Sequence, residues 1–188
     1  MGLVAPVLDW YSVKPFTRDD PATLDARPRA GNSPRLPQPP AGSLLRTPPA
    51  ALSDEEIQIV AKTLWGEARG EGKFGMEAVA SVIVNRLRRK YRRCDTAAEV
   101  CLDPQQFSCW NSGDPNRAKM KALNNNSIDA EYRLALQVAA QALGGGLPDP
   151  THGALHYVAR TLRSRPNWLL GKTPCLVMGN HEFYNDVA

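Results

Sequence analysis

The stretch that decides the fold is LSDEEIQIVAKTLWGEARGEGKFGMEAVASVIVNRLRRKY, residues 52–91. Ser53 and Glu56 form a capping box, in which each side chain accepts a backbone N–H of the other residue, and this pattern predicts a helix start. Apolar residues then recur at helical spacing, at Ile57, Val60, Ala61, Leu64, Trp65 and Ala68. We expect this first helix to end at the glycines, Gly66, Gly70 and Gly72.

A second helix is predicted over residues 75–91, because one face of it is apolar: Met76, Val79, Ala80, Ile83 and Leu87. A polar line lies on the opposite side, at Glu77, Ser81 and Asn85. Residues 86–93 contain six Arg and Lys side chains, which suit the negative end of a helix. We interpret this basic run as a solvated helix end. Nucleic-acid binding is the alternative, although Tyr91 is the only aromatic residue in the run and no nucleic-acid motif accompanies it.

The rest of the chain predicts fewer regular elements. A third helix covers residues 128–143, with Ser127 as its cap and Gly144, Gly145 and Gly146 as its stop. A short helix is expected over residues 96–100, and strand-like runs occur at residues 154–158 and 176–178. The pattern predicts an α+β domain that is mainly α, with a small β-sheet.

Proline divides the chain into two parts. Ten of the 16 prolines fall in residues 1–50, where they block helices and remove backbone donors. We therefore expect residues 1–51 to be an extended leader and linker, whose apolar patch could dock onto a partner, and residues 52–188 to be the folded domain. The chain of 188 residues is long enough for one such core.

Composition excludes several classes of protein. No apolar run approaches the roughly 18 residues of a membrane span, and no basic segment precedes the first apolar patch as in a signal peptide. The 23 basic and 19 acidic residues give a net charge of +4, which fits solubility and a weak attraction to polyanions and does not by itself indicate nucleic-acid binding. We expect a monomer. His152 and His156 lack the helical context that zinc ligands with this spacing need, so we expect no metal and no cofactor.

Glu67 is the first candidate catalytic residue. It lies at the edge of the apolar stripe and near the carboxyl end of the first helix, where partial desolvation and the helix dipole both favour a protonated carboxyl group. A protonated acid is what cleavage of a glycosidic bond requires. The alternative is a glutamate at a helix boundary that faces water. Glu71, four residues on, would share its face if the helix continued, or would bind loop amides if it did not.

The segment PQQFSCW, residues 104–110, mixes aromatic side chains with amide and hydroxyl groups. Sugars are bound in this way, because aromatic rings cover the apolar face of the sugar while polar groups fix its orientation. The alternative is that Phe107 and Trp110 simply enter the core.

These residues resemble the SleB-type cell wall hydrolases, the family of the spore-cortex lytic enzymes. The first block of the resemblance is LWGEARGE, residues 64–71, followed by AVASVIVNR, residues 78–86. PQQFSCW forms the second block. GALHY at residues 153–157, PNW at 166–168 and GNHEFY at 179–184 form the last. Together they cover about residues 53–186.

The resemblance implies a compact lysozyme-like domain that binds peptidoglycan glycan strands. It implies cleavage of the β-1,4 bond between muramic acid and glucosamine by a lytic transglycosylase, with Glu67 as the single acid and base. A second carboxylate, as in ordinary glycosidases, would have to be Glu71 or Glu182. We expect substrate hydrogen bonds from Glu71, Gln106, Ser108, Tyr157 and His181, and aromatic contacts from Trp110, Trp168 and Tyr184.

The chain also departs from the spore enzymes, because it shows no signal peptide and no separate wall-binding domain. That departure suggests a phage endolysin or virion lysin acting at the wall or periplasm, or a bacterial enzyme exported in another way. In an oxidising periplasm the cysteines could pair as Cys94–Cys101 and Cys109–Cys175. A muramidase-type hydrolase, or a wall-binding or virion structural protein without activity, remains the alternative function.

Overall fold

The computed structural model describes residues 52–162 and 164–187. The predicted leader, residues 1–51, lies outside the described residues, so its extended form stays a prediction. Among the residues that are described, no helix combines the length and the apolar character needed to cross a bilayer.

Helix α1 (Asp54–Ala68) begins at Ser53, as predicted, and the Ser53 hydroxyl accepts the Glu56 N–H at 3.0 Å. The second half of the predicted capping box is wrong. The Glu56 carboxylate accepts the N–H of Ala97 at 2.7 Å instead, which fastens α1 to the start of α3 (Ala97–Leu102). A complete capping box occurs at α3 itself, between Thr96 and Glu99.

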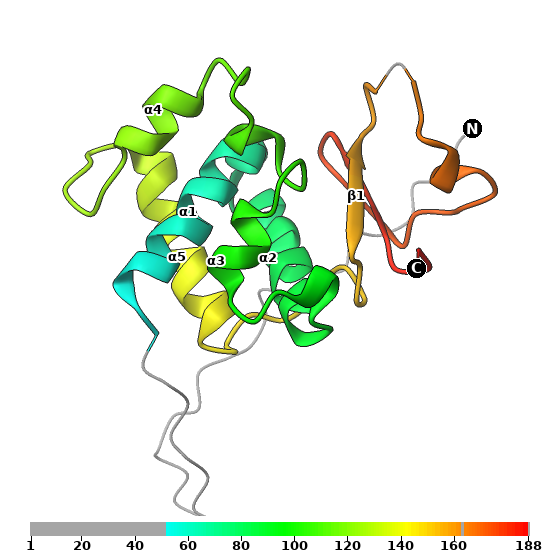
Figure 1. Cartoon of the computed structure of the whole chain (residues 1–188), viewed down its shortest axis with the longest axis horizontal. Helices are drawn as coiled ribbons and strands as arrows, with labels where there is room; N and C mark the ends of the chain where they lie inside the picture. The colour runs from blue at the N-terminus through cyan, green and yellow to red at the C-terminus, as the bar shows by residue number, and fades with distance from the viewer. Residues whose placement is uncertain (1–51, 163, 188) are drawn as a thin grey trace, which may run out of the picture. The chain divides into compact units, whose positions relative to one another are not determined.

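Helices α1, α2 (Gly72–Arg88) and α5 (Ala130–Leu143) pack against one another and enclose the core (Figure 1). Helix α2 begins and ends three residues earlier than predicted. The cap of α5 is Asp129 rather than Ser127, because the Asp129 carboxylate accepts the Tyr132 N–H. Gly66 does not help to end α1, since the helix continues through it to Ala68.

Short elements fill the connections, and most of them have no periodic signal in the sequence. They are α4 (Arg117–Ala122) and the 3-10 turns η1 (Arg69–Glu71), η2 (Tyr91–Arg93), η3 (Ser108–Trp110) and η4 (Asn167–Leu169). The predicted short helix at residues 96–100 is present as α3, shifted toward the carboxyl end.

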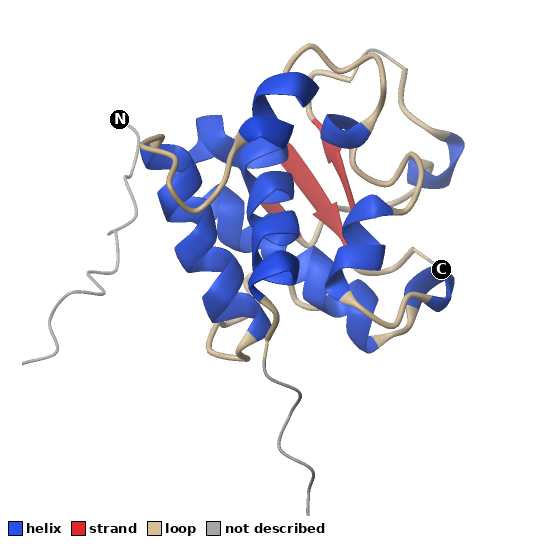
Figure 2. Cartoon of the chain, turned by 60° about the vertical axis from the view of Figure 1, so that its left-hand side comes forward, coloured by secondary structure: helices blue, strands red, loops and turns tan. Residues whose placement is uncertain are grey.

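The sheet has three antiparallel strands in the order β1-β3-β2. Figure 2 draws the strands in red. They are β1 (His156–Ala159), β2 (Leu176–Met178) and β3 (His181–Tyr184). The central strand β3 was not predicted, and β1 begins two residues later than expected. In the register of β1 and β3, Tyr157 lies opposite Phe183 and Ala159 opposite His181, so these four side chains share one face of the sheet. The predicted α+β, mainly helical fold is confirmed.

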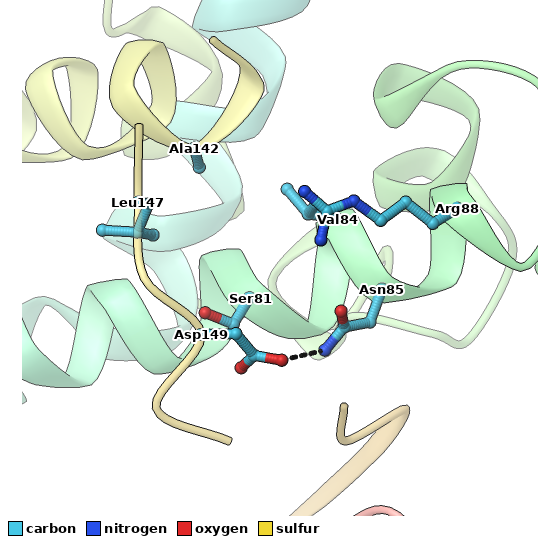
Figure 3. A pocket seen from close by; sticks show the side chains of 7 residues that line it. All are labelled: Ser81, Val84, Asn85, Arg88, Ala142, Leu147 and Asp149. Carbon is cyan, nitrogen blue, oxygen red and sulfur yellow. Dashed lines mark hydrogen bonds between the residues drawn. The ribbon is translucent and has the colours of Figure 1, made fainter. Parts of the chain in front are cut away.

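The polar line of α2 does not face away from the protein, as the apolar pattern suggested. Ser81 and Asn85 are buried, and the Asn85 amide donates to Asp149 at 2.9 Å and to the Ala154 carbonyl at 3.3 Å. Figure 3 shows this contact beside a recess of about 10 Å³, room for a single water molecule and too small for a ligand. The polar line therefore attaches the segment before β1 to the helices.

Arg86 also differs from the solvated basic run of which it was predicted to be part. Its side chain is only 4% exposed, its Nε donates to the Leu155 carbonyl at 2.8 Å, and its guanidinium lies 5.2 Å from the ring centres of both Tyr91 and Phe107. The later cations of the run are exposed, as expected.

The predicted disulfides are wrong, because all four cysteines are free. Cys94, Cys101 and Cys109 are buried among apolar side chains, and burial raises the pKa of Cys101 to about 12. The Cys175 thiol instead donates to the carbonyl of Thr151 at 3.1 Å.

His156 makes the domain sensitive to mild acid. Its Nε2 lies 3.2 Å from the Tyr91 hydroxyl, its Nδ1 is buried without a hydrogen-bond partner, and Trp168 covers its ring. Desolvation first, and the Arg86 charge second, lower the pKa of His156. The unfolded chain therefore takes up this proton at a higher pH than the folded domain does, and stability falls as pH drops below the unfolded value of about 6.5.

We predict that the free energy of unfolding, measured by urea titration, falls between about pH 7.5 and 5.5, above the ordinary range of carboxylates. His156→Gln should flatten this dependence. The control is His152→Gln, because His152 is exposed. An unchanged slope in His156→Gln would contradict the assignment.

Candidate active site

Glu67 projects from the last turn of α1, and three donors hold its carboxylate. Oε1 accepts the Ser108 hydroxyl at 3.1 Å and the backbone N–H of Cys109 at 2.8 Å. Oε2 accepts the Tyr157 hydroxyl at 3.0 Å. The donors come from a loop about 40 residues and a strand 90 residues further along the chain. The carboxylate is thus fixed in one orientation while remaining partly exposed.

Tyr157 is enclosed by aromatic rings. The His181 ring meets it edge-on at 5.1 Å, the Phe183 ring stacks on it at 5.5 Å, and Phe107 lies 6.4 Å away. Burial, and next the negative charge of Glu67, raise the pKa of the Tyr157 phenol well above its ordinary value. Tyr157 therefore remains a neutral hydrogen-bond donor to Glu67 throughout the physiological pH range.

Gly66 allows the loop that carries Ser108 and Cys109 to approach α1. A Cβ atom at Gly66 would lie 2.4 Å from the Cys109 Cβ and 2.8 Å from its Sγ, closer than atoms can pack. The absence of a side chain at Gly66 is thus what brings the Cys109 N–H within reach of Glu67.

Glu71 joins the helices to the sheet. Oε1 of the Glu71 carboxylate accepts the Asn180 N–H at 3.0 Å, and Nδ1 of His181 lies 3.0 Å from both Oε1 and Oε2. Gly179, in a left-handed conformation, and Gly75 leave space for this side chain, because a Cβ at either would meet it within 3 Å. Glu71 thus takes the role of binding loop amides, which was one of the two possibilities that the sequence left open.

A cleft of about 430 Å³ opens beside Glu67. It brings together the predicted residues Glu67, Gln106, Ser108, Tyr157 and His181. Gln105, from the predicted sugar-binding segment, also lines the cleft. Sequence reasoning gave no site role to the further lining residues Asn111, Val158, Ala159, Leu162 and the buried Arg86. Two walls result: an amide-rich loop and a more apolar strand end. Such a mixed surface suits a sugar, which has both polar edges and apolar faces.

Four predicted site residues do not line this cleft. Glu71 lies on the far side of the His181 ring, and its carboxylate is used by the protein itself. The Trp110 indole N–H donates to Thr63 of α1 at 2.9 Å, and the ring packs against the core. Tyr184 is buried and donates to Glu182 at 2.8 Å. Trp168, predicted for an aromatic contact, packs on His156 and Tyr184.

Glu182 does not line the cleft; it follows His181 in β3, and successive residues of a strand point to opposite faces. Its carboxylate accepts the Tyr184 hydroxyl and pairs with Arg165, and these two contacts, the Tyr184 hydrogen bond first, lower the pKa of Glu182. Glu67 is therefore the one carboxylate that lines the cleft among the described residues. Across the same residues, no three His, Cys, Asp or Glu side chains are grouped to hold a metal ion.

Comparison with known proteins gives a consistent family. Residues 70–184 match the family described as Cell Wall Hydrolase, in a match that begins just after Glu67. Spore cortex-lytic enzymes are similar: that of Halalkalibacterium halodurans is 30% identical over 73% of this chain and 37% of its own length. That of Bacillus subtilis is 28% identical over 72% and 39%. The chain therefore spans less than half the length of these curated relatives.

Solved structures agree with the fold. The catalytic domain of the Bacillus cereus SleB protein superposes with a TM-score of 0.56 and 27% identity, over 72% of this chain and 94% of that one. The catalytic domain of the germination-specific lytic transglycosylase SleB from Bacillus anthracis gives 0.55 and 26%, over 72% and 98%. The predicted resemblance to SleB-type enzymes and the predicted lysozyme-like fold are both confirmed.

The contact between Gly66 and Cys109 generates a prediction. Gly66→Ala should destabilise the domain by about 1–3 kcal/mol, because the added methyl group overpacks the contact and pushes the Cys109 loop away from Glu67. Urea denaturation measures the change in the free energy of unfolding.

The matched control is Gly70→Ala, because a Cβ at Gly70 meets nothing within 4 Å. That variant should stay within about 0.5 kcal/mol of the parent protein. Equal losses in the two variants would show that the close approach at Gly66 is not the cause.

Proposed function

Since the chain belongs to the Cell Wall Hydrolase family, we propose that it cleaves the glycan strands of peptidoglycan at the bond between muramic acid and glucosamine, with Glu67 as acid and base. The observation that carries this proposal is the Glu67 carboxylate, fixed by three donors at the wall of a cleft lined with amides and apolar side chains. The spore cortex-lytic relatives and the SleB catalytic domains support it.

The reaction begins with Glu67 protonated. The acid gives its proton to the glycosidic oxygen, the bond from that oxygen to C1 of muramic acid breaks, and positive charge develops at C1. The C6 hydroxyl of the same sugar then attacks C1 while the Glu67 carboxylate takes the hydroxyl proton. The product is a 1,6-anhydro end, and Glu67 is protonated again, so no water is consumed.

The residues around Glu67 serve both halves of this cycle. In the carboxylate form, Ser108, Tyr157 and the Cys109 N–H stabilise the negative charge. In the acid form, a hydroxyl can rotate to accept the new O–H, because serine and tyrosine hydroxyls both donate and accept. The surroundings of Glu67 therefore tolerate the change of protonation that the cycle requires.

Transglycosylation is favoured over hydrolysis because glycosidases that use water ordinarily need two carboxylates flanking the bond. Glu67 alone supplies a carboxylate to the cleft within the described residues, since Glu71 binds Asn180 and His181, and Glu182 lies on the other face of the sheet. We propose the wall as the site of action. A phage origin, a partner for residues 1–51 and the monomeric state stay predictions.

The first test is a digest of purified peptidoglycan with products separated and weighed. The wild-type chain should release muropeptides that are one water molecule lighter than the hydrated form. Glu67→Gln should lower the rate by at least about 10²–10⁴-fold, the usual contribution of a general acid or base.

The matched control is Glu182→Gln, which should keep its activity because this carboxylate is absent from the cleft. Hydrated products together with loss of activity in Glu182→Gln would point to a two-carboxylate hydrolase. A wild-type chain that binds peptidoglycan without releasing products would make it a wall-binding protein.

A further inference from the structure

His181 occupies the cleft in a fixed orientation. It is 8% exposed, its ring stands edge-on to Tyr157 at 87°, and its Nδ1 lies 3.0 Å from the Glu71 carboxylate. An ionised carboxylate can only accept hydrogen bonds, so the 3.0 Å contact requires a proton on Nδ1. In a neutral imidazole, the proton on Nδ1 leaves Nε2 as an acceptor.

The surroundings of Glu71 keep it in this role. Asn180, one residue before His181, donates its backbone N–H to the same carboxylate at 3.0 Å. Gly75 and Gly179 close around the side chain, since a Cβ at either would lie within 3 Å of it. Because Glu71 cannot turn away, the His181 ring cannot exchange its two nitrogens without losing the Glu71 contact.

The remaining polar groups of the cleft make an acceptor on this wall useful. The Ser108 and Tyr157 hydroxyls donate their hydrogen bonds to Glu67, and the Arg86 guanidinium can only donate. A glycan presents hydroxyl and amide N–H donors along its length. On the sheet side of the cleft, Nε2 of His181 adds an uncharged acceptor beside the Tyr157 hydroxyl oxygen, which can accept a hydrogen bond while it donates to Glu67.

We infer that Glu71 is a positioning residue of the cleft: it holds His181 as the tautomer protonated at Nδ1, so that Nε2 accepts a hydrogen bond from a hydroxyl or amide N–H of the bound glycan. This inference rests on the proposed function for its ligand. It changes the predicted role of Glu71, which acts on the glycan through His181 rather than by contact.

The first test reads the tautomer directly, without activity. In the full-length chain at about pH 8, above the ordinary histidine pKa of about 6.5, nitrogen NMR of labelled histidine distinguishes the protonated from the bare ring nitrogen. His181→Gln assigns its resonances by their loss. We expect His181 to show a protonated Nδ1 and a bare Nε2. A proton on Nε2, alone or in an imidazolium, would overturn the inference.

Glu71→Gln tests the cause, because it keeps the size of the side chain. Its carbonyl oxygen must replace Oε1 to accept the Asn180 N–H, which places the amide NH₂ group at the position of Oε2, 3.0 Å from Nδ1 of His181. The tautomer should then shift toward a protonated Nε2. The matched control is Glu77→Gln, a carboxylate on α2 that pairs with Lys73 and lies outside the cleft, and its spectrum should match that of the parent protein.

The second test measures binding in the Glu67→Gln background, where the glycan stays intact. The probe is a tetrasaccharide of alternating N-acetylglucosamine and N-acetylmuramic acid, titrated by calorimetry. Adding Glu71→Gln should raise the dissociation constant about tenfold to hundredfold, because the protonated Nε2 of His181 would then face a hydrogen-bond donor of the glycan. Adding Glu77→Gln should not.

The outcomes separate the two proposals. Unchanged affinity in the Glu71→Gln pair, despite the expected tautomer, would overturn the acceptor role of His181. If the wild-type chain binds the tetrasaccharide and never cleaves peptidoglycan, the proposed function fails while the tautomer and binding results still decide the role of Glu71.

Discussion

The hydrogen bond from Tyr157 to Glu67 connects the helices of the domain to its sheet at the proposed active site. Glu67 belongs to the helices and Tyr157 to the sheet, and 90 residues of chain separate them. The bond can form only if strand β1 has one position along helix α1 and one orientation relative to it. Much of the remaining architecture maintains that placement. Asn85 and Arg86 of α2 bind the segment that leads into β1, through Asp149, Ala154 and Leu155.

A second attachment runs parallel to the first. Glu71 follows Glu67 by four residues and binds His181 on β3, while Tyr157 and His181 lie on the same face of the paired strands. Two carboxylates from one short stretch of chain thus hold two neighbouring strands. A rotation of the sheet about either contact is blocked by the other, which explains how a sheet of only three short strands keeps a fixed orientation on the helices.

The sequence predicts the helices well and the contacts between elements poorly. Apolar spacing locates α1, α2 and α5 to within a few residues, because burial of one helix face has a clear period. Strand β3 escapes prediction, since its four residues alternate between two buried faces and include His181 and Glu182. The capping partner of Glu56 and the burial of Arg86 were also missed, because both depend on segments distant in the chain.

In the site, Glu67 follows from local context and family resemblance. The placement of Trp110 and Tyr184 outside the cleft does not follow from the sequence, because an aromatic residue gives the same sequence pattern whether it binds a sugar or packs in the core.

The free cysteines have a consequence for where the domain can assemble. Three of the four thiols pack in the core, and that of Cys175 donates to a backbone carbonyl. Burial raises the pKa of each thiol above its ordinary value. Thiolate is the form that attacks oxidants and alkylating reagents, so these side chains are poor nucleophiles in the folded state. Folding accordingly requires neither an oxidant nor a disulfide isomerase. The same native domain can therefore form in a reducing or in an oxidising compartment.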